Sequence, residues 1–189
     1  MNPNEPLRVS KIIAARTQLR TAISFWFTDD DPVSVHTLAY AAHEIIHRLF
    51  RNRGLSGLMF DSMEMTKEER EAFILDLKET ANFFKHANRD ASEEGSIVFN
   101  PYTNELYIGA CISGLVRMGL ALFDGEWAFC YWRAIHDRRR WSSFTQFGWS
   151  EEVLNNFAGL NREQFFPFFI TQWRARYGTE PVLAPLKQR

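Results

Sequence analysis

Residues 31–54 read DPVSVHTLAYAAHEIIHRLFRNRG, and this stretch predicts one long helix on which the rest of the chain is organised. Asp31 is a residue type that caps helix starts, Pro32 fits the first helical position, and Gly54 fits the position just past the end. Between these signals the apolar residues recur at helical spacing and cover one broad arc: Val35, Leu38, Ala39, Ala42, Ile45, Ile46 and Leu49. The stretch therefore predicts an amphipathic helix with one main core face.

A second stripe of side chains lies on nearly the opposite side of this helix, formed by His36, Tyr40, His43 and His47. Each member follows the previous one by three or four residues, so all four share a face. This histidine stripe faces solvent, a cleft or a second packing partner. The sequence leaves these three possibilities open.

Residues 43–47 read HEIIH and match HExxH, a pattern that binds zinc in many metallopeptidases. Two imidazoles four residues apart can bind one zinc ion while the glutamate acts on the metal-bound water. The longer metzincin pattern requires a third histidine, and this chain has Arg53 at that position. A zinc-dependent hydrolase, with His43 and His47 as ligands and Glu44 as base, is therefore the alternative hypothesis. The simpler interpretation is a polar helix face that needs no cofactor.

The remaining sequence predicts helices over residues 9–27, 103–123 and 126–139. Another helix, third in chain order, is expected to begin at the capping box formed by Thr66 and Glu69. Two shorter helices are expected to begin near residues 150 and 161. Residues 97–99 are the best strand candidate. We therefore expect an all-α, single-domain bundle of about five to seven helices over residues 1–189, with little or no sheet. Residues 1–6 and 180–189 are expected to be flexible ends.

Composition narrows the classes of function. The 189 residues carry a formal net charge of −1, so no overall field attracts nucleic acid or an anionic membrane. The polar N-terminus lacks a signal-peptide pattern, and the longest weakly polar run, residues 106–123, is interrupted by Arg117. Cys111 and Cys130 form no metal-binding pair and suit a reducing compartment. These features predict a cytoplasmic protein without a membrane partner.

Residues 81–90, ANFFKHANRD, gather polar and basic side chains at a helix end. Asn82, His86 and Arg89 share a face, and Lys85 lies four residues before Arg89. Such a face can bind a phosphate or a nucleic-acid backbone, with His86 also placed to act as a general acid or base. The alternative is that these cations only complement the dipole of the helix C-terminus.

Two further arrangements involve histidines or arginines. If the helix that ends near His86 packs antiparallel to the helix of the histidine stripe, His86 approaches His36 rather than His47, which would allow a metal site without peptidase chemistry. Separately, the run Arg138–Arg140 places three basic side chains next to the aromatic side chain of Trp141. This combination can bind single-stranded nucleic acid, or it can simply close a helix.

The segments HTLAYAAHEIIHRLFRNRG and ANFFKHANRD, followed by FNP, resemble a group of uncharacterised bacterial proteins with an NFFKHA-type motif. More distantly, the two-helix pattern resembles HEPN domains. That resemblance implies a bundle of four to five helices, often dimeric, found in toxin, defence and RNA-processing systems. Many HEPN domains are ribonucleases in which an arginine precedes the active-site histidine by five to seven positions, whereas here those positions hold Glu79, Thr80 and Ala81.

The sequence therefore predicts a helical-bundle interaction or nucleic-acid-associated module, and it leaves open whether the protein is an enzyme. The expected partners are a second copy of the chain, RNA or another protein. The expected binding residues are Asn82, Lys85, His86 and Arg89. No cofactor is expected, with zinc at His43 and His47 as the alternative.

Overall fold

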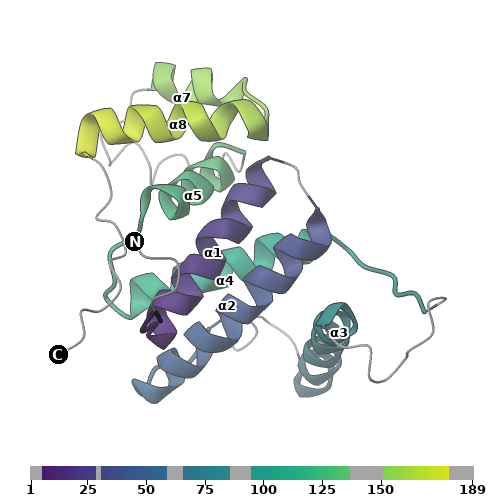
Figure 1. The fold of residues 1–189 in the computed structure, drawn as a ribbon. Coiled ribbons are helices and arrows are strands. Elements are labelled where there is room, and N and C mark those ends of the chain that lie inside the picture. Colours follow the sequence, from purple (N-terminus) through teal and green to yellow (C-terminus); the bar gives the residue numbers. More distant parts are fainter. Residues whose placement is uncertain (1–5, 29–30, 59–65, 86–94, 137–150, 179–189) are drawn as a thin grey trace.

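The computed structural model describes residues 6–28, 31–58, 66–85, 95–136 and 151–178. Within these ranges the chain forms seven helices and no strand (Figure 1). The helices are α1 (Lys11–Phe27), α2 (Pro32–Asn52), α3 (Lys67–Lys85), α4 (Tyr102–Arg117), α5 (Asp124–His136), α7 (Glu151–Ala158) and α8 (Arg162–Tyr177). The prediction of an all-α bundle is confirmed.

Helix α2 begins and ends where its sequence signals predict. The Asp31 carboxylate accepts hydrogen bonds from the backbone N–H groups of Val33 and Ser34 at 3.0 and 3.1 Å. Pro32 occupies the first turn, and Gly54 follows the end of the helix with a φ of +73°. These contacts pair backbone groups that a helix end otherwise leaves unsatisfied.

Two other predicted helix starts are also formed. Thr66 and Glu69 exchange both hydrogen bonds of a capping box at the start of α3. Asn161 and Gln164 form the same arrangement at the start of α8. Local sequence therefore fixes where three of the helices begin.

The core has two parts that meet along α1. Helices α1, α2 and α4 pack together as the first part, and α5, α7 and α8 form the second part beside α1 (Figure 1). Phe27 at the end of α1 stacks on Phe166 of α8 with ring centroids 4.6 Å apart. Helix α3 stands at the edge of the bundle, where it packs against α2.

One buried ion pair joins α1 to the start of α5. The Arg16 guanidinium lies 2.6 Å from the Glu126 carboxylate and also donates to the carbonyl of Ala121 at 2.7 Å. The same carboxylate accepts from the backbone N–H of Phe123 at 2.8 Å. Because the donors of this network surround Glu126, its charge is matched even though burial raises its pKa.

Two sequence predictions of local structure are wrong. Residues 97–99 form no strand; instead Phe99 packs its ring edge-on to His36. Helix α4 stops at Arg117, whereas apolar periodicity predicted that it continues to residue 123. Gly119 ends it with a φ of +74°, a conformation that side-chain-bearing residues rarely adopt.

Within the described ranges, the structure bears on the two sequence predictions about cysteines and membrane spans. Cys111 is a fully buried thiol, and burial raises its pKa, whereas Cys130 is half-buried. No helix in the described ranges is long and apolar enough to cross a membrane. The predicted basic run Arg138–Arg140 and nearly all of the predicted flexible ends lie outside these ranges.

Candidate functional site at the junction of three helices

The start of α2, the end of α3 and the segment from Phe99 to Glu105 meet at one place, here called the junction. Asn104 lies at its centre and is buried. Its Nδ2 donates to the carbonyl of Pro32 at 3.0 Å, so its Oδ1 must accept from Nδ1–H of His36 at 2.9 Å. This pair of bonds holds His36 in one tautomer and leaves its Nε2 as a lone-pair acceptor.

The His36 imidazole is fully buried among aromatic rings. Phe84, Phe99 and Tyr107 each present a ring edge-on to it, with centroid distances of 5.6, 5.0 and 5.4 Å. Burial lowers the pKa of His36, the nearby Lys85 lowers it further, and the bond to Asn104 opposes both. Its Nε2 has no hydrogen-bond partner within the part of the chain that the structure describes. Burial and the unpartnered Nε2 both favour the neutral form of the His36 imidazole.

The end of α3 lies against the start of α2, as antiparallel packing of the two helices requires. Besides the Phe84 contact with His36, the Lys85 ammonium lies 4.3 Å from the centre of the Tyr40 ring. Burial lowers the pKa of Lys85, and the Glu44 carboxylate opposes this shift. Lys85 thus holds the end of α3 to α2. Of the other predicted binding residues, Asn82 is half-buried, and His86 and Arg89 lie outside the described residues.

The histidine stripe of α2 faces a second packing partner. His36, Tyr40 and His43 are all buried, and all three contact Tyr107 of α4. His47 is half-buried. The stripe is therefore mostly interior, in contact with α4 and covered at one end by α3.

The HEIIH residues have a defined geometry within this stripe. The rings of His43 and His47 are nearly parallel, with centroids 5.5 Å apart. His43 is 8% exposed; burial, followed by the effect of His47, lowers its pKa to about 4. Its Nε2 has no hydrogen-bond partner among the described residues.

Glu44, the predicted base, lies on the exposed side of α2. Its carboxylate accepts from the Tyr40 hydroxyl at 3.2 Å. Burial, followed by the negative charge of Glu44, raises the pKa of Tyr40 to about 12. In the described ranges no group of three or more histidine, cysteine, aspartate or glutamate side chains is placed to hold a metal. The described residues thus offer two nitrogen ligands on one helix and no third.

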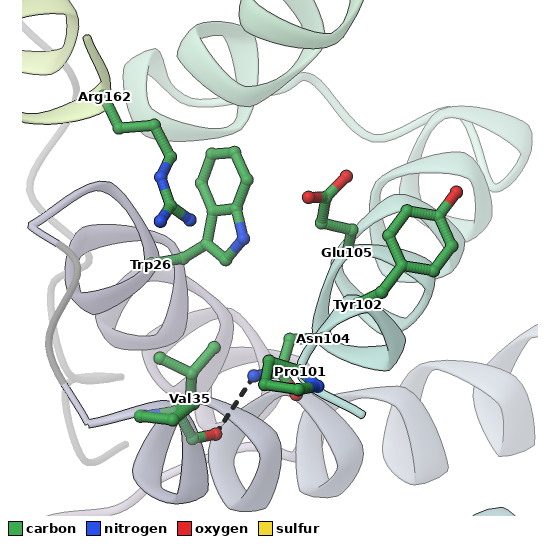
Figure 2. Close-up of a pocket in the computed structure, with 8 residues that line it drawn as sticks. Trp26, Val35, Pro101, Tyr102, Asn104, Glu105 and Arg162 are labelled. Atoms are coloured by element: carbon green, nitrogen blue, oxygen red, sulfur yellow. Dashed lines mark hydrogen bonds between the residues drawn. The ribbon is translucent and has the colours of Figure 1, made fainter. Parts of the chain in front are cut away.

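A pocket of about 440 Å³ lies beside the junction, with Asn104 in its lining. Residues from α1, α2, α4 and α8, together with the segment before α4, line it: Trp26, Pro32, Val35, Pro101, Tyr102, Asn104, Glu105 and Arg162 (Figure 2). The Arg162 guanidinium lies 4.8 Å from the Trp26 ring centre. In Figure 2 this guanidinium and the Glu105 carboxylate lie to either side of the indole.

The charges around this pocket are partly paired. Arg133 of α5 donates to Glu105 at 3.1 Å, and both side chains are partly exposed. Arg162 and Glu105 thus bring one positive and one negative side chain to the lining of the pocket. Sequence reasoning missed this site because Trp26, Glu105 and Arg162 come from distant helices and belong to no local motif.

Comparisons with known protein families, with curated proteins and with solved structures find no match to this chain. The geometry of the junction and its pocket is therefore the basis for assigning a function.

Proposed function

We propose that this protein is a helical-bundle binding module for single-stranded RNA, and that the pocket at the junction holds one nucleotide. The observation that carries the proposal is a guanidinium placed against an indole in the wall of an open pocket, Arg162 on Trp26. The pocket volume of about 440 Å³ falls in the usual range for small-ligand sites.

Each wall of the pocket has a separate role in this proposal. Trp26 is only 6% exposed, so it serves as a floor that keeps the Arg162 guanidinium in place. The Arg162 guanidinium supplies charged hydrogen bonds to a phosphate. Tyr102 is 54% exposed at the rim, where an unstacked base can lie on its ring. RNA presents unstacked bases and phosphates together in its single-stranded regions.

The distant resemblance to HEPN domains points to the same class of ligand. The chain lacks the arginine that precedes the active-site histidine in many HEPN ribonucleases. We therefore propose that the protein binds RNA and does not cleave it. Because the formal net charge is −1, affinity must come from local contacts and should be modest.

The test is fluorescence anisotropy of a labelled single-stranded RNA of mixed sequence at low salt, with variants of α8. Arg162→Gln should weaken binding by about tenfold, because it removes a charge-assisted hydrogen bond to phosphate. Arg176→Gln makes the same charge change at the other, exposed end of α8 and should leave affinity unchanged. Equal affinities for both variants and the wild type would exclude the pocket as the RNA site.

A Lys85 variant distinguishes RNA binding in the pocket from RNA binding at the site that the sequence predicted. Its ammonium lies over Tyr40, so we expect Lys85→Ala to change RNA affinity less than Arg162→Gln does. The opposite ranking would move the RNA contact to the end of α3. If no RNA binds at all, the expected partner is a protein, and the proposal of an RNA module is wrong.

The zinc-dependent hydrolase is the second candidate, and one observation favours it: the buried Nε2 of His43 has no partner among the described residues. Metal analysis of protein purified without a His tag tests it. Stoichiometric zinc that is lost in His47→Ala supports the hydrolase; absence of zinc, together with an unchanged Tm on adding it, contradicts it. A homodimer stays a prediction, which sedimentation equilibrium can check.

A further inference from the structure

The pocket at the junction contains a carboxylate, which a site for phosphate alone would exclude. Glu105 lines the pocket from the first turn of α4, and its side chain is 25% exposed. A phosphate and a carboxylate are both anionic acceptors, so they repel each other and share no proton donor. Because the proposed function assigns the phosphate to Arg162, Glu105 is left to contact another part of the nucleotide.

Glu105 is held in place and can still accept hydrogen bonds. Arg133 of α5 donates to its Oε2 at 3.1 Å, and this ion pair fixes where the carboxylate lies. The described part of the chain places no donor on Oε1. A carboxylate offers about four lone-pair sites over its two oxygens. Glu105 can therefore accept two further hydrogen bonds from a ligand.

Two aromatic side chains flank this carboxylate. In Figure 2 it lies between the Trp26 indole and the Tyr102 ring, and the indole nitrogen is on the side of Trp26 that faces Glu105. Tyr102 precedes Glu105 by three residues on α4, so the two share a face of the helix. An indole N–H is a donor only. A base stacked on Tyr102 therefore meets a carboxylate that accepts and an indole N–H that donates.

Guanine is the RNA base whose polar groups match this pair. Its Watson–Crick edge carries the N1–H and N2–H donors side by side, next to the O6 acceptor. Adenine and cytosine each present one amino group beside an unprotonated ring nitrogen, and uracil has one N–H between two carbonyls. Those bases bring a lone pair against the carboxylate, which leaves acceptors facing each other without a proton. Guanine can donate both N–H groups to Glu105 and accept at O6 from Trp26.

We propose that the pocket is selective for guanosine, with Glu105 as the residue that reads the guanine Watson–Crick edge while Tyr102 stacks on the base. This specificity rests on the proposed binding of RNA, in which Arg162 contacts the phosphate. It accounts for a carboxylate and a guanidinium in the lining of one pocket, because the two contact different parts of the same nucleotide.

Fluorescence anisotropy at low salt tests this selectivity with labelled RNAs that differ at one position. The probes are a short oligouridine and the same oligomer with a single central guanosine, adenosine, cytidine or inosine. The guanosine RNA should bind about tenfold more tightly than the uridine, adenosine and cytidine RNAs, which is the discrimination that a bidentate base contact provides. Inosine keeps N1–H and lacks the 2-amino group, so the inosine RNA should bind with intermediate affinity.

Glu105→Gln should abolish the preference for guanosine, because an amide has one acceptor oxygen and brings its own N–H groups to the guanine donors. Affinity for the uridine RNA should not fall in this variant, which also shows that it is folded. Glu79→Gln makes the same charge change at an exposed position of α3 outside the pocket lining, and it should keep the preference.

The outcomes separate this specificity from the proposed function. Equal affinities of the wild type for all five RNAs would overturn guanosine selectivity and leave RNA binding in place. A preference that persists in Glu105→Gln would overturn the role of Glu105. An equal loss of affinity for every RNA in Glu105→Gln would place the carboxylate on the ribose and overturn the base contact. Absence of binding to every RNA would overturn the proposed function and this specificity together.

Discussion

Gly114 of α4 lies against Ile46 of α2, and its replacement by alanine tests the packing of the central core. A Cβ at this position would lie 2.8 Å from Cγ2 of Ile46 and 3.2 Å from Cδ2 of Leu58. Both neighbours are buried, so neither can move aside freely. Alanine at Gly109 of the same helix would meet no atom within 4 Å. The two glycines therefore form a matched pair.

The expected effects have opposite signs. Overpacking a core by one methyl group destabilises by about 1–3 kcal/mol, and alanine in place of glycine favours a helix by about 1 kcal/mol. Gly114→Ala should therefore lower the free energy of unfolding by up to about 2 kcal/mol. Gly109→Ala should raise it by about 0.5–1 kcal/mol.

Urea unfolding followed by tryptophan fluorescence measures both changes on the same scale. The midpoint should move down for Gly114→Ala and up for Gly109→Ala, with an unchanged dependence on urea. If Gly114→Ala stabilises the protein as much as Gly109→Ala does, then α2 and α4 do not approach closely at Gly114, and the packing of the central core is wrong.

Three further predictions concern stability. Glu126→Gln leaves the buried Arg16 guanidinium without its counter-ion, so unfolding free energy should fall by about 3–5 kcal/mol in urea titrations; a change below about 1 kcal/mol would mean that the pair is solvated. The free energy of unfolding should fall by up to about 3 kcal/mol between pH 6.5 and 4, because the pKa of His43 is about 4 when folded and ordinarily 6.5. His43→Leu should flatten that pH profile; an equally steep profile would assign the pH dependence to another titratable group. Tyr40→Phe removes one hydroxyl that donates to exposed Glu44, so thermal unfolding should change by less than about 1 kcal/mol, and a larger loss would show that this bond is buried.

Helix starts could be predicted from the sequence because they depend on local chemistry. Asp31, Thr66 and Asn161 each accept hydrogen bonds from backbone groups two or three residues away, so a short window contains the whole signal. The end of α4 was misplaced because apolar residues continue past Arg117. There Gly119 takes a left-handed conformation that periodicity does not detect.

The site could be predicted only in part, because its contacts join distant segments. Helical spacing identified the histidine stripe, but its packing against Tyr107 depends on how α2 and α4 dock. The pocket brings Trp26 next to Arg162, and no local pattern links the two. The sequence places His43 and His47 four residues apart on one helix, whereas the burial of His43 depends on tertiary packing.

The salt dependence of RNA binding tests the central claim most directly, because it counts phosphate contacts. Each contact to single-stranded RNA contributes about 0.7 to the slope of log affinity against log salt. The proposed site predicts that Arg162→Gln lowers the slope by about 0.7, while Arg176→Gln leaves it unchanged. An unchanged slope in Arg162→Gln would show that this guanidinium contacts no phosphate and that the pocket is not the RNA site.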